Sequence, residues 1–333
     1  MRVLFIGGTG VISTACTRLA AARGLEVVLL NRGRHAADVP TGVRVLHADA
    51  NDRQGVERTV AGQTFDAVVD WIVFDTEAVE RDIALFAHRT GQYVFISSAS
   101  AYQKPPTQFL ITESTPLANP FWEYSRKKIA CEERLLRAYR EDGFPVTIVR
   151  PSHTYGPTML PTAVGGGPTV LGRMRQGRKV IVHGDGESLW VLTHNTDFAK
   201  GLVGLLGHPQ ALGHAFHITS DQVLTWNQIY REIGRAAGVE PELVHIPSDF
   251  IARHDPATGP GLLGDKAISV VFDNGKVKRL VSDFACTVPF SRGVEESVAW
   301  LDADPERGRI DPERDAVMDR IIRAYEGGLE GIG

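Results

Sequence analysis

Short apolar runs alternate with helical patterns through the first half of the chain, and this alternation most restricts the possible fold. The runs that we interpret as strands are 3–6, 27–30, 43–46, 67–69, 93–96 and 146–149. Between them, helical patterns lie near 11–23, 53–61, 75–88 and 122–142. Strands that alternate with helices at this spacing form βαβ units. The sequence therefore predicts an α/β fold built on a doubly wound parallel sheet.

A glycine-rich turn, Gly7-Gly8-Thr9-Gly10, follows the first strand directly and precedes a helix. Glycine allows a sharp turn and a close approach of the backbone to a pyrophosphate, whose charge is stabilised at the helix N-terminus. Ser13 stands where a third glycine is usual, and it is small enough for close helix–strand packing. A plain strand-to-helix turn is the alternative. The context of strand, turn and helix favours a dinucleotide site formed by Gly7, Thr9, Gly10, Val11 and Ile12.

The second strand ends in Asn31 and Arg32, where NAD-binding domains usually place an acidic residue for the ribose 2′-hydroxyl. An arginine can instead bind a 2′-phosphate in a charge-assisted contact, so the sequence favours NADP over NAD as the cofactor. The alternative is that Arg32 and Arg34 are solvated loop charges. Asp49, followed by Ala50, comes after the third strand and is expected either to contact the adenine end of the cofactor or to cap a helix.

Tyr124 and Lys128 are four residues apart in a helical segment and therefore share one face of that helix. A free phenol, with a pKa of about 10, is a poor acid–base group at neutral pH. A nearby ammonium and a cationic nicotinamide both favour the phenolate, so this pair is suited to proton transfer. Ser98 would hold the reacting oxygen against Tyr124. The alternative is that Tyr124 and Lys128 are only a surface pair on the helix. Lys127, the neighbouring lysine, lies three residues after Tyr124 and therefore lacks the four-residue spacing.

In this order, the motifs resemble those of the extended short-chain dehydrogenase/reductase family, the NAD-dependent epimerase/dehydratase group. The resemblance spans nearly the whole chain and implies a Rossmann-type sheet that binds NAD or NADP. Besides the glycine turn and the Tyr124/Lys128 pair, it rests on Phe95-Ile96-Ser97-Ser98-Ala99-Ser100-Ala101-Tyr102, Arg150-Pro151, Tyr155-Gly156-Pro157 and Gly184-Asp185-Gly186.

The resemblance also implies roles for individual residues. Ser98 lies four residues before Tyr102, at the position of the family's catalytic serine or threonine, with Ser97 and Ser100 as alternatives. Tyr124 is implied as the catalytic acid/base, and Lys128 as its electrostatic partner and a ribose ligand. Further cofactor contacts are expected from Trp71, Ser97, Pro151, Ser152 and His153, and substrate contacts from Ser100, His153 and Trp190.

Three positions depart from family members that act on nucleotide sugars. His153 stands where those members usually carry asparagine, and Trp190 stands where an arginine often binds the nucleotide phosphate. Asp70-Trp71-Ile72 replaces the common His-x-Ala-Ala. The missing arginine argues against a diphosphate ligand, and a tryptophan suits an apolar face or a sugar ring. His153 is equally a candidate for a second acid or base and for a hydrogen-bonded structural residue.

The second half of the chain differs from the first in composition and in its pattern of elements. Residues 156–190 are rich in glycine and proline, 214–219 read as one more strand of the sheet, and 225–238 and 312–326 carry helical patterns. We expect a smaller C-terminal substrate-binding domain that is interleaved with the first domain. The predicted division is a dinucleotide-binding Rossmann domain of residues 1–160 and 190–222, and a substrate-binding domain of residues 161–189 and 223–333.

The composition argues against several other classes of protein. Apolar residues make up 43% of the chain, so a core can form without disulfides or metal. The net charge is −4 and no long basic run is present, so we expect no nucleic-acid surface. The N-terminus has no pattern of a signal peptide or membrane span. Three widely spaced cysteines, which form no metal pattern, suggest a reducing compartment, and we expect a cytoplasmic protein without a metal site.

These observations predict an NAD(P)-dependent oxidoreductase or epimerase that acts on a hydroxyl or keto group of a sugar-like or cyclitol substrate. Ala99 and Ser100 follow Ser98 where dehydratases carry an Asp-Glu pair, so simple dehydration is less favoured. One alternative is a nucleotide-sugar 4-epimerase, similar to UDP-glucose epimerase, with tightly held NAD. Another is a non-catalytic NAD(P)-binding or RNA-binding relative.

The resemblance further implies a homodimer that forms through the Tyr124 helix and the helix before it. The segment 126–140 carries an apolar stripe that suits such an interface, although core packing explains it equally well. The stripe consists of Ile129, Leu135, Leu136 and Tyr139.

Overall fold

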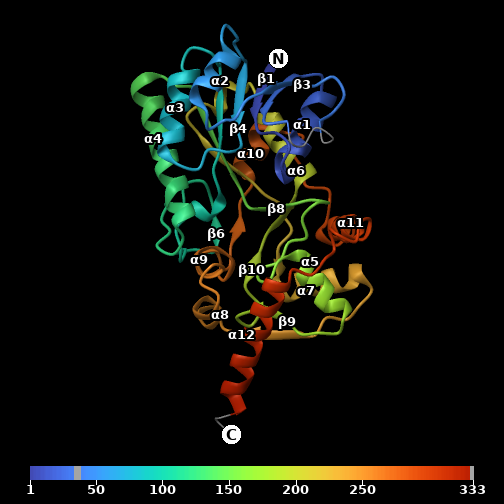
Figure 1. Ribbon diagram of the computed structural model, residues 1–333. Helices are drawn as coiled ribbons and strands as arrows, with labels where there is room; N and C mark the ends of the chain where they lie inside the picture. The colour runs from blue at the N-terminus through green and yellow to red at the C-terminus, as the bar shows by residue number, and fades with distance from the viewer. Residues whose placement is uncertain (34–38, 331–333) are drawn as a thin grey trace.

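A parallel sheet forms the centre of the computed structural model, which describes residues 1–33 and 39–330 (Figure 1). Within these residues the sheet has seven strands in the order β12-β7-β5-β4-β1-β2-β3, and every neighbouring pair is parallel. This order reverses direction at β1, which confirms the predicted doubly wound α/β fold. The strands are β1 (Arg2–Ile6), β2 (Glu26–Asn31), β3 (Arg44–His47), β4 (Ala67–Asp70), β5 (Tyr93–Ile96), β7 (Val146–Pro151) and β12 (Ala215–Ile218).

Both faces of the sheet are covered by helices, because alternate side chains of each strand point to opposite faces. In β1, Val3 and Phe5 belong to one core cluster, whereas Leu4 and Ile6 belong to the other. The first cluster includes α1 (Val11–Ala22), α6 (Asn195–Leu205) and α10 (Gly275–Leu280). The second includes α2 (Arg53–Val60), α3 (Thr76–Phe86) and α4 (Glu123–Asp142), and Figure 1 shows α3 and α4 side by side.

The elements predicted in the first half are confirmed, with ends that differ by one or two residues. The strand expected near 214–219 is confirmed as β12. Several helices were not predicted individually. Among them are α6, which packs against α1, and α5 (Gly167–Arg175), which lies inside the glycine- and proline-rich stretch. Pro168 occupies the first turn of α5, where its missing amide hydrogen is no cost, so the composition of this stretch concealed a helix.

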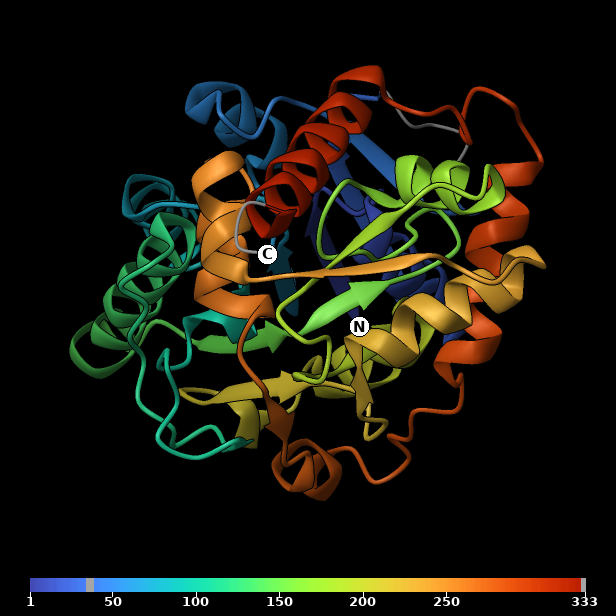
Figure 2. The same cartoon turned by 90° about the horizontal axis from the view of Figure 1, so that it is seen from below.

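A second group of elements, below the sheet in Figure 1, shares its own hydrophobic cluster. Its strands β9 (Val180–His183) and β14 (Leu243–Ile246) form a parallel pair, and α12 (Pro312–Glu330) packs on this pair (Figure 2). The helix α7 (Trp226–Ala237) begins with a capping box between Thr225 and Gln228 and packs against α11 (Phe290–Asp302). The domain division given above stays a prediction.

Short elements connect this group to the end of the sheet. Those that bear on the site are the 3₁₀ turn η2 (Ala99–Ala101), β8 (His153–Tyr155), β10 (Leu189–Trp190), β11 (Leu192–His194) and the π-helical turn η4 (Leu262–Lys266). The remaining ones are β6 (Leu110–Ile111), η3 (Pro209–Ala211), β13 (Leu224–Thr225), α8 (Ser248–His254), α9 (Gly259–Gly261) and β15 (Val271–Phe272).

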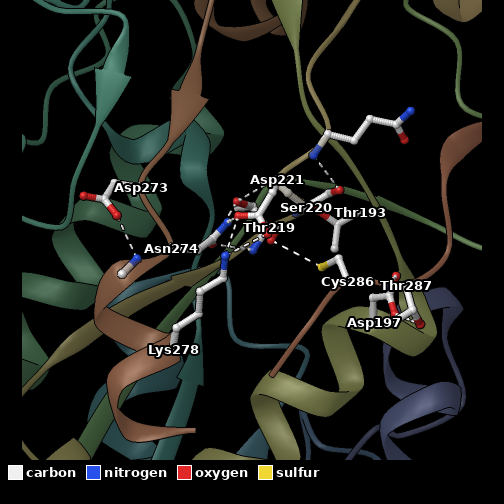
Figure 3. Close-up of polar contacts among 12 residues, drawn as sticks. Thr193, Asp197, Thr219, Ser220, Asp221, Asp273, Asn274, Lys278, Cys286 and Thr287 are labelled. Atoms are coloured by element: carbon white, nitrogen blue, oxygen red, sulfur yellow. Dashed lines mark hydrogen bonds and ion pairs between the residues drawn. The ribbon is translucent and has the colours of Figure 1, made fainter. Parts of the chain in front are cut away.

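A polar cluster fixes the segment after β12 to its neighbours (Figure 3). Asn274 accepts a hydrogen bond from the Thr219 hydroxyl at 3.1 Å and donates one to Asp221 at 3.0 Å. The amide of Ser220 donates to Thr193 Oγ1 at 2.9 Å, and Thr193 lies on β11. The chain that follows the last sheet strand is thus tied to the segment that precedes α6.

None of the described helices combines the length and the apolar character that crossing a membrane requires. Within the described ranges, His, Cys, Asp and Glu side chains form no group of three or more that could hold a metal ion.

Candidate active site

The glycine turn after β1 forms one end of the site. Gly7 and Gly8 have φ angles of 101° and 89°, which other residues rarely adopt. A Cβ atom on Gly8 would lie 2.6 Å from the Leu29 side chain, so the turn packs too tightly for a larger residue. The amide of Gly10, just before α1, donates to Ser13 Oγ at 2.8 Å. Ser13 therefore contributes a hydrogen bond to the turn at the position of the usual third glycine.

A cavity of about 680 Å³ is lined by residues at the carboxyl ends of the sheet strands and by the first turn of α1. A glycine cradle beside a helix N-terminus is suited to a pyrophosphate, and a cavity of this size can hold a dinucleotide. The predicted cofactor residues on its wall are Gly7, Thr9, Gly10, Val11, Ile12, Asn31, Arg32, Asp49, Ala50, Trp71, Ser97, Tyr124, Lys128 and Pro151. Ser152 and His153 lie instead on a neighbouring cavity, described below.

Arg32 lies on this wall beside Asp49. The distance from Arg32 Nη1 to Asp49 Oδ2 is 4.0 Å, and both side chains are about half exposed. Asn31 Oδ1 accepts a hydrogen bond from the amide of Gly33 at 2.8 Å, so Asn31 shapes the turn that presents Arg32. The helix α2 is capped by Asp52 and not by Asp49. Arg34 lies in 34–38, outside the described residues.

Lys128 is held in a fixed position below Tyr124. Its Nζ donates to the carbonyl oxygens of Val73 at 2.6 Å and Ile96 at 2.8 Å, and lies 5.8 Å from the centroid of the Tyr124 ring. Only 2% of Lys128 is exposed, and burial lowers its pKa to about 8. Lys127, by contrast, forms a solvent-exposed ion pair with Glu123 at 3.1 Å.

The turn after β4 presents the carbonyl group that binds Lys128. Asp70, the last residue of β4, accepts a hydrogen bond from the amide of Ile72 at 2.7 Å, and this closes the turn just before Val73. Burial and the neighbouring carboxyl group of Asp82 raise the pKa of Asp70. The sequence Asp70-Trp71-Ile72, one of the departures noted above, therefore shapes the binding site of the Lys128 ammonium.

Three serine hydroxyls form a chain beside Tyr124. Ser98 Oγ lies 2.8 Å from Ser100 Oγ, and Ser125 Oγ donates to Ser100 Oγ at 2.7 Å. Burial raises the pKa of Tyr124, and a side-chain hydrogen bond with Ser98 partly opposes this effect. Of the three serines considered from the sequence, Ser98 and Ser100 share a cavity with Tyr124, and Ser98 is the one that lowers the pKa of the phenol.

Ser97 points to a buried ion pair instead. Its hydroxyl donates to Glu132 at 2.5 Å, and Glu132 forms a two-pronged ion pair with Arg150, from Nε at 2.9 Å and from Nη2 at 2.5 Å. The two charged side chains are 0% and 4% exposed. Sequence reasoning missed Glu132, although it lies four residues after Lys128 and thus on the same face of α4. This pair joins α4 to β7 directly behind the site.

A second cavity, of about 220 Å³, opens on the other side of Tyr124. Tyr124 and Pro151 line both cavities, so the Tyr124 side chain lies where the two cavities adjoin. The predicted residues on the wall of the second cavity are Ser98, Ser100, Tyr124, Pro151, Ser152, His153 and Trp190. Sequence reasoning did not identify Trp122, Asp265, Lys266, Val270 and Phe272, which also line it.

His153 is fixed as a neutral hydrogen-bond donor. Its Nδ1 accepts a hydrogen bond from the indole Nε1 of Trp190 at 3.2 Å. Burial, with a smaller effect of the Lys266 charge, lowers the pKa of His153 to about 3. A neutral imidazole that accepts at Nδ1 carries its proton on Nε2. His153 therefore carries a ring N–H on Nε2 and is not a base that titrates near neutrality.

Ser152 is held from behind by the polar cluster of Figure 3. Its Oγ lies 3.0 Å from Thr193 Oγ1, which also accepts the amide hydrogen of Ser220. Because β11, which carries Thr193, pairs with β8, the hydroxyl of Ser152 is fixed at the start of the segment that carries His153.

Asn119 joins three parts of the second cavity. Its Nδ2 donates to the carbonyl oxygens of Ser100 at 2.9 Å and Gly264 at 2.8 Å, and its Oδ1 accepts from the amide of Trp122 at 3.0 Å. Asn119 thus connects the serine turn, the start of α4 and the π-helical turn η4. Sequence reasoning could not recognise the role of Asn119 from a local pattern, because its partner Gly264 is 145 residues away in the sequence.

Comparison with known proteins gives consistent matches. The model of the NAD dependent epimerase/dehydratase family matches residues 3–219. Among curated proteins, the chain is 28% identical to a 2'-dehydrokanamycin reductase of Streptomyces kanamyceticus, over 90% of this chain and 84% of that protein. It is 27% identical to the chloroplast stem-loop binding protein of 41 kDa b of Arabidopsis thaliana, over 75% and 67% of the two chains.

The fold also matches solved structures. The epimerase Mth375 of Methanothermobacter thermautotrophicus aligns with a TM-score of 0.75 and 17% identity, over 92% of this chain and 94% of that one. At this level of identity the match concerns the fold.

Proposed function

The chain belongs to the NAD-dependent epimerase/dehydratase family and is an NAD(P)-dependent oxidoreductase or epimerase, and we propose that it acts on a hydroxyl or keto group of a sugar-like or cyclitol substrate with Tyr124 as the acid/base. The observation that carries this proposal is the position of Tyr124 on the wall of both cavities. The larger cavity suits the dinucleotide and the smaller one a ring-sized substrate.

When bound in the larger cavity, the nicotinamide cofactor would supply or accept the hydride. The proton is moved by the chain itself. Ser98 holds the reacting oxygen of the substrate against the Tyr124 hydroxyl, and Tyr124 donates or accepts the proton at that oxygen. The ammonium of Lys128, fixed by two backbone carbonyls 5.8 Å from the centroid of the Tyr124 ring, would stabilise the phenolate that forms when Tyr124 gives up its proton.

Net reduction or oxidation fits the site better than dehydration, because Ala99 and Ser100 follow Ser98 where an acidic pair would act. A nucleotide-sugar 4-epimerase has less support, because Trp190 is buried against Trp226 and donates to His153 where such enzymes often use an arginine. Binding of RNA has little support because the net charge is −4. The relative 2'-dehydrokanamycin reductase is by its name a reductase, which supports the same direction.

The cofactor is proposed to be NADP. Arg32 lies on the cavity wall at the end of β2, and Asn31 replaces the acid that would repel a 2′-phosphate. Asp49 lies 4.0 Å from Arg32 and would compete with the phosphate for its guanidinium. The proposal therefore needs a direct comparison of the two cofactors.

We also propose a homodimer formed through α3 and α4. Of the stripe on α4, Leu135 is buried in the core, Ile129 and Leu136 are partly buried, and 37% of Tyr139 is exposed. The stripe thus contributes mainly to the core, and Tyr139 is its exposed member. Light scattering after gel filtration distinguishes a dimer from a monomer.

The proposed function is tested with the purified protein. Absorbance in the reduced-nicotinamide band reports whether a cofactor is retained, and release of the cofactor identifies it. A panel of keto sugars and ketocyclitols is then tested with NADPH and NADH. We expect cofactor oxidation with at least one of these substrates in the wild type and its loss in Tyr124→Phe. Turnover that persists in Tyr124→Phe would contradict the role given to this residue.

A further inference from the structure

The π-helical turn η4 brings two charged residues to the substrate cavity. Asp265 and Lys266 both line this cavity, and they come from the C-terminal part of the chain. The turn is anchored at both ends. Gly264 O accepts from Asn119, and Lys266 O accepts from Trp226 Nε1 at 3.1 Å and lies 3.0 Å from His183 Nε2. The backbone that carries the two charges is therefore held by buried side chains.

The ammonium of Lys266 lies near two ring residues that line the cavity. Its Nζ is 5.7 Å from the centroid of the Trp122 ring, and its charge contributes to the low pKa of His153. Among the described residues, no carboxylate forms an ion pair with Lys266 and no hydrogen bond of its Nζ is present. The cation thus faces the cavity without a protein partner in the described part of the chain.

Asp265 does not neutralise this cation, because it already faces another one. Lys104 Nζ lies 3.6 Å from Asp265 Oδ1, and the Lys104 side chain is only 2% exposed. Asp265 is therefore already paired with Lys104, and Lys266 is left as a cation on the cavity wall without a counter-ion among the described residues. The other polar side chains that line the cavity include hydroxyls and the neutral His153, whose second ring nitrogen is a donor.

We propose that the substrate is a polyhydroxylated ring that carries a carboxylate, and that Lys266 binds this carboxylate. This inference rests on the proposed function, which it narrows from sugar-like molecules to sugar acids. An ammonium in a partly buried cavity is most favourably paired with a fixed anion. The Trp122 ring and the donors of Ser98, Ser100 and His153 would hold the rest of the ring against Tyr124.

A carboxylate fits this position better than a nucleotide handle. The cavity is small, about 220 Å³, and its wall includes Trp190, which is 3% exposed and packed on Trp226. The anion that Lys266 binds must therefore lie next to the reacting ring, as a carboxylate substituent does. An amino sugar is disfavoured, because its cation would meet the ammonium of Lys266.

The test measures binding to the cofactor-loaded enzyme by isothermal titration calorimetry. The probes are D-glucuronate, D-glucose, D-glucosamine and D-glucose 6-phosphate. The variants are Lys266→Met, which removes the charge but keeps most of the side-chain volume, Lys266→Arg, which keeps the charge, and Asp265→Asn, which removes the opposing carboxylate. Lys127→Met, on the exposed surface of α4, is the matched control.

We expect the wild type to bind glucuronate at least about tenfold more tightly than glucose, as loss of a charge-assisted hydrogen bond implies. Lys266→Met should remove this preference, while Lys266→Arg and Lys127→Met should keep most of it. Asp265→Asn should increase it, because one negative charge is removed. Opposite effects of two neighbouring substitutions would not arise from a general loss of structure.

Three outcomes overturn the inference. Glucose or glucosamine bound as tightly as glucuronate would exclude the carboxylate and leave the proposed function intact. Tighter binding of glucose 6-phosphate than of glucuronate would mean that Lys266 binds a phosphoryl group and not a carboxylate. Absence of binding by all four sugars would count against both the inference and the sugar-like substrate of the proposed function.

Discussion

Trp190 donates its indole hydrogen to Nδ1 of His153 at 3.2 Å, so two of the residues that depart from the nucleotide-sugar pattern are in direct contact. The Trp190 ring also packs on Trp226, with 5.4 Å between ring centroids. The indole thus determines which nitrogen of His153 carries the proton, and the pair forms one wall of the substrate cavity. The two departures are parts of a single structural feature.

Replacement of Trp190 by phenylalanine should therefore alter His153. The hydrogen bond to Nδ1 is lost, so the imidazole can protonate at either nitrogen and substrate binding should weaken, with a KM increase of about five- to tenfold from one lost hydrogen bond. Steady-state kinetics measures this effect. His153→Gln, which keeps a donor, should retain more activity than His153→Leu, and equal activity of these two variants would refute the donor role.

Acid should destabilise the protein through His153. Its pKa is about 3 in the folded chain and about 6.5 when unfolded, so the unfolded state binds a proton between these values and the folded state does not. The stability associated with neutral His153 is complete above about pH 6.5 and decreases as the pH falls towards 3. Urea denaturation of the wild type and His153→Gln at pH 7 and 5 measures this, and the difference between the two proteins should change with pH.

Tyr124→Phe should lower kcat by about 10²- to 10⁴-fold, because a general acid is removed. Cofactor affinity and fold should remain close to those of the wild type, because only the hydroxyl is lost. Tyr139→Phe, on the exposed part of the same helix, is the control and should leave kcat unchanged. A kcat for Tyr124→Phe within a fewfold of the wild-type value would show that another group transfers the proton.

Lys128→Met should reduce both kcat and cofactor affinity, since one ammonium stabilises the phenolate and lies on the cofactor cavity. Because burial lowers the pKa of Lys128 to about 8, this ammonium is lost as the pH rises through that value. The wild-type kcat should therefore decrease above about pH 8, and the kcat of Lys128→Met should not show this decrease. Lys127→Met should behave like the wild type across the whole profile.

Arg32→Ala should weaken NADP binding by about ten- to a hundredfold and NAD binding much less, if the guanidinium contacts a 2′-phosphate. Fluorescence titration with each cofactor measures the two affinities. Arg44→Ala, at the opposite end of the neighbouring strand β3, is the control. Equal losses for NADP and NAD, or tighter binding of NAD by the wild type, would remove the support for NADP.

Glu132→Gln should lower the free energy of unfolding by about 3–5 kcal/mol, because Arg150 is left as a buried charge without its counter-ion. Urea denaturation measures this change. Glu133→Gln, the exposed neighbour on α4, should change stability by less than about 0.5 kcal/mol. A small effect of Glu132→Gln would mean that the pair is not essential for holding α4 against β7.

The sequence determined the parts of this protein that depend on local patterns. The alternation of strands and helices predicted the sheet, because a period of two or of 3.6 residues can be recognised over a few turns of chain. For the same reason, the glycine turn and the Tyr124/Lys128 spacing could be recognised, and the residues of both motifs line one cavity. The helix α5 was not predicted, because a proline in the first turn of a helix cannot be told from a proline in a loop by sequence pattern alone.

Only the tertiary structure decided the chemistry of the substrate cavity. Asn119 and Gly264, and likewise His153 and Trp190, meet across long separations in the chain, and no local spacing encodes such contacts. The protonation states of His153 and Lys128 also depend on burial, which is a property of the packed molecule. The sequence thus specified which chemical groups are present, and folding set their partners and charges because these depend on residues far apart in the chain.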